Sequence, residues 1–222
     1  MRTVIFDLDG TLADTSGDLI ASANACFTGL GLGEPLDPVA DQLTAFQGGR
    51  AMLRLGFSRV RPEADESDVD AQFPLLLKHY EAAIDVHTVL YPGAVEAVEG
   101  LLSNGFKVGI CTNKPEGLAE TLMSRLGVRD LFGSLIGADT LPVRKPDPAP
   151  FVASVEQAGG RVDRSLLVGD TVTDRDTAKA AGVPSVLVTF GPEGQGISRL
   201  EPEALLHDYG QMCDVAERLL GR

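Results

Sequence analysis

The chain has 222 residues, 44% of them hydrophobic, and its 32 acidic side chains outnumber its 19 basic ones to give a formal net charge of −13. Its apolar stretches are far shorter than the ~18 residues that cross a bilayer, which excludes a membrane-spanning protein. The negative charge, with no basic patch, argues against nucleic acid or anionic lipid as a partner. Three scattered cysteines and a short N-terminal apolar run favour a cytoplasmic location without an export signal.

The first predicted strand covers residues 3–6 and is followed by Asp7-Leu8-Asp9-Gly10-Thr11. Gly10 permits a sharp turn, so a loop here can present both carboxylates together. Such a pair taken alone is often only a helix cap in a solvated loop. Its place after a buried strand favours a functional site, because ligands of open α/β sheets bind at the carboxyl ends of the strands.

The next stretch, residues 14–89, has helical periodicity and no convincing strand, with apolar residues recurring on one face, as in Leu19, Ile20, Ala23 and Phe27. We interpret it as an inserted helical domain. The remainder, residues 1–13 plus 90–222, is then the core. Both connections of the insert would lie near the carboxyl end of the first strand, where an insert can close over a site and exclude water.

After the insert, short apolar runs alternate with segments of helical period. The runs cover residues 107–111, 134–137, 166–169 and 186–188. Continuous apolar runs of this length are typical of strands buried on both faces, and their alternation with helices is typical of a parallel sheet. The predicted fold class is therefore α/β, with a Rossmann-like parallel sheet core and an inserted all-helical cap domain.

Two segments of this core offer groups that suit a phosphate. Thr112 and Asn113 follow the strand at 107–111 and provide a hydroxyl, an amide and backbone N–H groups at a helix start. Ordinary helix capping explains these two residues equally well when they are taken alone. The prolines of Arg144-Lys145-Pro146-Asp147-Pro148 stiffen a loop that holds the cation of Lys145 at the same edge of the sheet.

The strand at 166–169 is followed by Asp170 and, four residues later, Asp174. In a parallel sheet these carboxylates belong at the same edge as Asp7 and Asp9. Four anions crowded together repel one another unless a hard divalent cation such as Mg²⁺ sits among them. The sequence therefore predicts a Mg²⁺ site at this edge, with Lys145 as the counter-charge.

In order and in position, these motifs resemble those of the haloacid dehalogenase-like phosphohydrolases. Other segments are similar to the phosphoglycolate phosphatase subgroup, which has a helical cap after the first motif: residues 88–93, 111–115, 137–141 and 144–148. The resemblance implies a Mg²⁺-dependent phosphomonoesterase that acts on a small-molecule phosphate, foremost 2-phosphoglycolate, through an aspartyl-phosphate. Hydrolytic dehalogenases lack the second acid of the Asp-x-Asp pair, so dehalogenation is disfavoured.

The resemblance also implies roles for individual residues. Asp7 would be the nucleophile, and Asp9 would protonate the leaving alkoxide and then activate water. Thr11 would orient Asp9. The metal would be held by Asp7, the backbone carbonyl of Asp9 and Asp170, with Asp174 in the outer sphere, and the phosphate would be bound by Thr112, Asn113 and Lys145.

The leaving group is expected to be recognised by the insert, where Phe46-Gln47-Gly48-Gly49-Arg50 forms a glycine turn that opens a helix. Arg50 is the candidate partner for a substrate carboxylate. A solvated cation at a helix start explains Arg50 at least as well. The segment also departs from the Gly-x-Gly pattern of the subgroup.

Three other functions share parts of this pattern. A signalling receiver domain also has an acidic pocket with a threonine and a lysine, although the insert and the Asp-x-Asp-Gly-Thr motif count against it. A phosphosugar mutase would use the same core residues, and pyrophosphate or another small phosphate ester could be the substrate. The assembly is expected to be a monomer or a homodimer.

Overall fold

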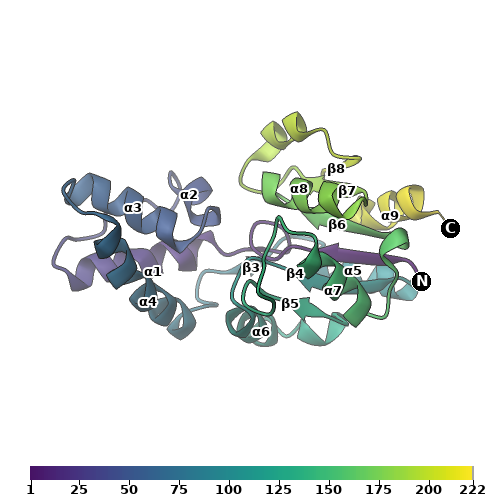
Figure 1. The fold of residues 1–222 in the computed structure, drawn as a ribbon, viewed down its shortest axis with the longest axis horizontal. Helices are drawn as coiled ribbons and strands as arrows, with labels where there is room; N and C mark the ends of the chain where they lie inside the picture. Colours follow the sequence, from purple (N-terminus) through teal and green to yellow (C-terminus); the bar gives the residue numbers. More distant parts are fainter. Residues whose placement is uncertain (222) are drawn as a thin grey trace. The chain divides into compact units, whose positions relative to one another are not determined.

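The computed structural model describes residues 1–221 (Figure 1). The chain divides into two compact units, one formed by Met1–Ala13 with Leu90–Arg222 and the other by Asp14–Val89. We call them the α/β unit and the helical unit. Among the described residues, no helix is both long enough and apolar enough to span a membrane.

A six-stranded sheet forms the centre of the α/β unit, in the order β5-β4-β1-β6-β7-β8 and with every pairing parallel. Every residue of β1, β6 and β7 is buried, as expected for strands covered on both faces. The predicted fold class is confirmed. The strands are β1 (Thr3–Phe6), β4 (Lys107–Cys111), β5 (Leu135–Ile136), β6 (Ser165–Gly169), β7 (Ser185–Val188) and β8 (Ala204–Leu206).

Helices cover both faces of this sheet (Figure 1). On one face α7 and α8 pack against each other and bury Phe151, Val155 and Ala178 against Ile5 and Leu167. On the other face α5 and α9 contact each other as well as β4 and β6, as right-handed crossovers in the two directions from β1 require. The helices are α5 (Ala94–Ser103), α6 (Glu116–Arg125), α7 (Ala149–Gln157), α8 (Val172–Ala181) and α9 (Met212–Leu220), with 3₁₀ turns η1 (Arg129–Leu131), η2 (Val162–Arg164), η3 (Gly194–Leu200) and η4 (Tyr209–Gln211).

The strand order places β1 between β4 and β6. The chain builds the sheet outward from β1 through β4 to β5 and then returns to the other side of β1 through β6. Connections on the two sides therefore leave in opposite directions and open a crevice at the carboxyl ends of these central strands. The residues that follow β1, β4 and β6 meet at this crevice.

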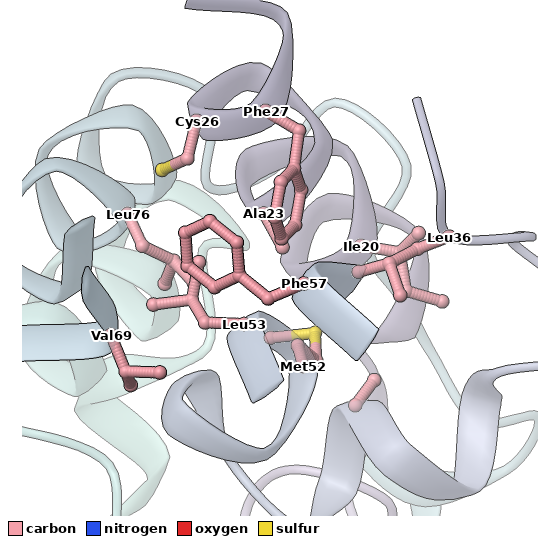
Figure 2. Packing of buried hydrophobic residues seen from close by; sticks show 11 residues of the cluster. Ile20, Ala23, Cys26, Phe27, Leu36, Met52, Leu53, Phe57, Val69 and Leu76 are labelled. Atoms are coloured by element: carbon pink, nitrogen blue, oxygen red, sulfur yellow. The ribbon is translucent and has the colours of Figure 1, made fainter. Parts of the chain in front are cut away.

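The helical unit consists of α1 (Ser16–Gly29), α2 (Gln42–Phe46), α3 (Gly49–Val60) and α4 (Glu66–Ala82), so the predicted helical insertion is confirmed. Figure 2 shows its core, in which the rings of Phe27 and Phe57 meet edge to face with centroids 5.0 Å apart. A Cβ on Gly56 would lie 2.2 Å from the Phe27 ring. Glycine at this position therefore lets α3 approach α1 closely.

The two ends of the helical unit are held next to each other. The short strands β2 (Ala13–Asp14) and β3 (Val89–Leu90) pair where the chain passes between the units. Asp18, 1% exposed, accepts hydrogen bonds from the backbone N–H groups of His87 and Thr88 at 2.9 and 2.8 Å. The Thr88 hydroxyl donates to the same carboxylate at 2.7 Å.

Candidate active site

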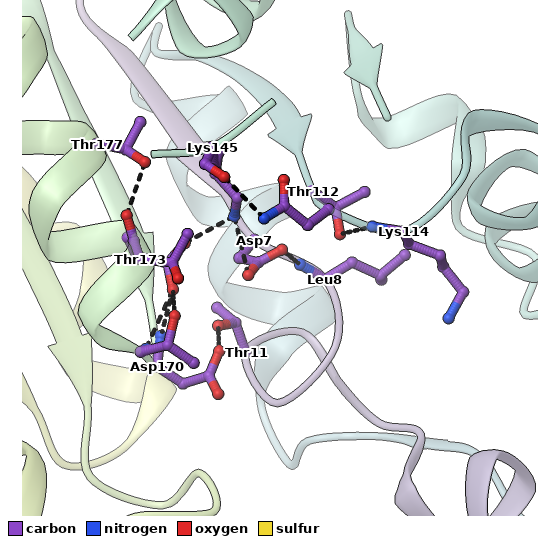
Figure 3. A network of polar contacts seen from close by, with 12 residues as sticks. Asp7, Leu8, Thr11, Thr112, Lys114, Lys145, Asp170, Thr173 and Thr177 are labelled. Atoms are coloured by element: carbon purple, nitrogen blue, oxygen red, sulfur yellow. Dashed lines mark hydrogen bonds and ion pairs between the residues drawn. The ribbon is translucent and has the colours of Figure 1, made fainter. Parts of the chain in front are cut away.

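Asp7 lies directly after β1 and is anchored to the neighbouring strand. Its backbone N–H donates to the carbonyl of Val168 at 2.9 Å, which extends the β1–β6 pairing by one residue. One carboxylate oxygen, Oδ1, accepts from the N–H of Leu8 at 2.7 Å, and the other, Oδ2, lies 2.9 Å from Nζ of Lys145 (Figure 3). Both oxygens are therefore held in fixed directions.

A tight turn follows Asp7. The carbonyl of Leu8 accepts from the N–H groups of three residues, 11, 12 and 13, and Gly10 takes a positive φ of 79°. A Cβ on Gly10 would lie 2.3 Å from Oδ2 of Asp170. Only glycine meets both the conformational and the spatial requirement, so the turn and Asp170 are packed as one structure.

The end of β6 supplies two more carboxylates. Asp174 lies in the first turn of α8 and forms a capping box with Thr171, whose N–H and hydroxyl donate to its Oδ2 at 3.1 and 2.7 Å. Its Oδ1 accepts from Nζ of Lys145 at 2.7 Å. A Cβ on Gly169 would lie 2.3 Å from the Cβ of Asp174, so a larger residue there would push this carboxylate away.

One oxygen each from Asp7, Asp170 and Asp174 lie within 4.8 Å of one another. We call these residues the acidic triad. Lys145, with its side chain 1% exposed, bridges two of them, Asp7 and Asp174. Four carboxylates were expected together, but the carboxylate of Asp9 instead pairs with Nζ of Lys114 at 2.8 Å. The ion pair with the buried ammonium of Lys114 accounts for the position of the Asp9 carboxylate.

Burial and mutual repulsion make it unfavourable for all three carboxyl groups of the triad to be ionised at once. Burial, together with the charge of Asp174, raises the pKa of Asp7 to about 7 even though Lys145 lowers it. Burial and the charges of Asp174 and Asp7 raise the pKa of Asp170 well above its usual value. Burial also acts to raise the pKa of Asp174, but Lys145 and the Thr171 hydrogen bonds outweigh it and lower that pKa. The neighbouring charges of Asp174 and Asp7 raise the pKa of Lys145 although burial lowers it, so Lys145 stays protonated.

The donor set of the triad suits a hard divalent cation. Oδ1 of Asp170 accepts from the hydroxyl of Thr11 at 2.7 Å, whereas its Oδ2 is buried without a hydrogen-bond partner among residues 1–221. A buried carboxylate oxygen without a partner is costly, and a cation would satisfy it. Thr11 was expected to orient Asp9, but its hydroxyl instead orients this candidate ligand.

Cation binding at the triad should depend on pH. A cation needs the ionised carboxylates, and Asp7, with a pKa of about 7, is largely protonated at low pH when no cation is present. Protons and the cation therefore compete. With Mg²⁺ as the probe cation, we expect the affinity to rise at least about tenfold between about pH 6 and about pH 8, with proton release on binding. Calorimetric titration in two buffers of different ionisation enthalpy measures both; a pH-independent affinity would contradict this assignment.

The residues predicted to bind phosphate lie beside Asp7 and Lys145 (Figure 3). The N–H of Thr112 donates to Ile136 on β5 at 2.9 Å, and its hydroxyl accepts from the N–H of Lys114 at 3.2 Å. The side-chain amide of Asn113 donates to the carbonyl of Lys145 at 3.0 Å. The loop after β4 is thus tied to the loop that carries Lys145.

Arg50 lies in the first turn of α3 in the helical unit. Its guanidinium pairs with Asp70 and lies 4.5 Å from the centroid of the Phe73 ring. With its side chain 42% exposed, Arg50 is held by partners on α4, within its own unit.

Two residues at the crevice were not identified from the sequence. Lys114, with its side chain 3% exposed, directly follows the predicted Thr112-Asn113 pair. It was not singled out, because a lysine in a loop is usually a solvated surface residue. Tyr209 is 2% exposed, and its hydroxyl donates to the carbonyl of Thr11 at 2.7 Å from 198 residues away. Its ring contacts those of Phe6 and Phe190. No local pattern reveals such a long-range contact.

A model of the family described as "Haloacid dehalogenase-like hydrolase" matches residues 4–188. The chain is 38% identical over 211 residues to a phosphoglycolate phosphatase of Agrobacterium fabrum, a match that covers 94% of this chain and 89% of the relative. It is 36% identical over 218 residues to a phosphoglycolate phosphatase of Mesorhizobium japonicum, covering 98% of this chain and 96% of the relative.

Solved structures share the fold. A crystal structure described as a predicted phosphoglycolate phosphatase from Haemophilus somnus superposes with a TM-score of 0.85 at 24% identity, covering 97% of both chains. A haloacid dehalogenase-like hydrolase from Bacteroides fragilis superposes with a TM-score of 0.79 at 23% identity, covering 96% of this chain and all of that one.

Proposed function

This chain belongs to the haloacid dehalogenase-like hydrolase family, and from that premise we propose that it is a Mg²⁺-dependent phosphatase that converts 2-phosphoglycolate to glycolate and phosphate. The observation that carries the proposal is the setting of Asp7, a carboxylate fixed by Leu8 and Lys145 within the acidic triad. The full-length relatives named phosphoglycolate phosphatase support the choice of substrate.

In the proposed reaction, a carboxylate oxygen of Asp7 attacks phosphorus while the bond to the ester oxygen breaks. Protonated Asp9 gives its proton to the departing glycolate oxygen, and an aspartyl-phosphate remains on Asp7. Asp9, now a carboxylate, takes a proton from water as that water attacks the phosphorus. The phosphate is released and Asp7 is regenerated.

The remaining groups hold the charges of this reaction in place. Lys145 keeps Asp7 oriented and offsets charge on the phosphate, with Thr112 and the N–H of Asn113 as further donors. The oxygens of Asp7 and Asp170 would hold Mg²⁺ together with the Asp9 carbonyl, with Asp174 in the outer sphere. When bound, Mg²⁺ would offset negative charge on the transferring phosphoryl group. This role fits Oδ2 of Asp170, which has no hydrogen-bond partner in the described part of the chain.

The test is Mg²⁺-dependent phosphate release from 2-phosphoglycolate, compared with pyrophosphate, sugar phosphates and simple alkyl phosphates. Since specificity is a ratio of kcat/KM values, we expect 2-phosphoglycolate to lead by about 100-fold or more. Chelation of the metal should stop every reaction. A lead for another ester would overturn the substrate, whereas an isomerised sugar phosphate without free phosphate would indicate a mutase.

A further inference from the structure

Lys114 is a buried cation that the proposed chemistry leaves without a task. In the described part of the chain, Lys114 and Lys145 are the lysines in the buried class, at 6% and 3% exposed. Lys145 serves the acidic triad. Nζ of Lys114 lies 2.8 Å from Oδ1 of Asp9 instead. Burial of an ammonium is costly, so its retention here calls for a reason beyond solubility.

The backbone of Lys114 is anchored on both sides. Its N–H donates to the hydroxyl of Thr112 at 3.2 Å, and its carbonyl accepts from the N–H of Ala138, beyond β5, at 2.9 Å. These two hydrogen bonds fix the backbone of Lys114 in the loop between β4 and α6. A side chain supported in this way can hold its charge at one place in the crevice.

The position of the Lys114 ammonium beside Asp9 places it near the leaving group of the proposed reaction. Asp9 gives its proton to the ester oxygen of the leaving group, so a cation next to Asp9 lies next to that leaving group. In 2-phosphoglycolate a single methylene separates the ester oxygen from the carboxylate. The ammonium of Lys114 has three N–H donors and can serve Asp9 and a second carboxylate at the same time.

We propose that Lys114 binds the carboxylate of the leaving group and makes the enzyme selective for phosphate esters of 2-hydroxy acids. This inference rests on the proposed function and refines it. Recognition of the leaving-group charge is then a property of the α/β unit. Arg50, the candidate that the sequence offered for this task, is engaged by Asp70 and Phe73.

The test compares 2-phosphoglycolate with ethyl phosphate, which has the same ester linkage and no carboxylate. In Lys114→Met, we expect the ratio of the two kcat/KM values to fall about 10- to 100-fold, the effect of losing a charged hydrogen bond. Lys114→Arg should retain most of the discrimination, because it keeps the cation. Lys179→Met, on an exposed position of α8, is the matched control and should not change the ratio.

The ratio separates substrate recognition from positioning of Asp9. An equal loss on both substrates would mean that Lys114 only orients Asp9, and would overturn the proposal. A fall of the ratio in Arg50→Met, with no change in Lys114→Met, would also overturn it. Lys114→Gln replaces the Met variant if the latter does not fold. If the wild-type enzyme itself does not prefer 2-phosphoglycolate, the proposed function fails before this test applies.

Discussion

Replacement of Asp7 by asparagine is expected to lower phosphate release from 2-phosphoglycolate by ~10⁴-fold or more, the scale found when a nucleophile is removed. The amide has nearly the shape of the carboxylate but is a far weaker nucleophile. It also cannot satisfy both neighbours, because the N–H of Leu8 and the ammonium of Lys145 are both donors. Stopped and continuous phosphate assays measure the loss.

The Asp7→Asn variant should remain folded, since the backbone of Asp7 is held by Val168 independently of its side chain. Circular dichroism and a melting curve provide this control. Asp14→Asn, at the start of the helical unit and just after the tight turn that follows Asp7, is a matched acid-to-amide change. Turnover by folded Asp7→Asn within tenfold of wild type would rule out nucleophilic catalysis by this residue.

Replacement of Lys145 by methionine is expected to impair both activity and stability. The change leaves the acidic triad without its buried cation, and breaking a buried pair costs about 3–5 kcal/mol of folding free energy. Loss of a charged group that faces the phosphate should lower kcat by about 10²- to 10³-fold. Denaturant unfolding and phosphate release measure the two effects, with Lys179→Met as the control.

The stability loss in Lys145→Met should depend on pH in a defined direction. Lys145 lowers the pKa of Asp7 and of Asp174, so its removal raises both. A buried carboxyl with a raised pKa destabilises the fold when ionised and much less when protonated. The loss should therefore be largest near pH 8 and shrink towards pH 5, and added Mg²⁺ should recover part of it. Equal destabilisation at both pH values would contradict this explanation.

The sequence predicted the fold well where a strand is buried on both faces. The runs at β1 and β4 coincide with the strands, because a continuous apolar segment such as Thr3–Phe6 has few alternatives to the centre of a parallel sheet. The sequence pattern did not predict β8, because the three residues of this strand, Ala204–Leu206, contain no β-branched side chain. This edge strand forms because β7 offers it a pairing partner, and pairing is not a local property.

At the site, the sequence indicated which carboxylates gather but not how each is held. Asp7, Asp170 and Asp174 were predictable from strand ends, since parallel strands present their carboxyl ends at one edge. The resemblance matched Thr11 to Asp9, yet the Thr11 hydroxyl donates to Asp170, 159 residues away. The pairing of Asp9 with Lys114 likewise joins residues that are 105 positions apart, which sequence spacing does not encode.

The central claim is that hydrolysis proceeds through a phosphorylated Asp7. The most direct measurement is rapid acid quenching of the wild-type enzyme during turnover of 2-phosphoglycolate with Mg²⁺, followed by peptide mass spectrometry. We expect a phosphoryl group on the peptide that contains Asp7, formed and lost at rates consistent with kcat, and absent in Asp7→Asn. Trapping on another residue, or turnover with no phosphoenzyme on a timescale that would reveal it, would contradict the claim.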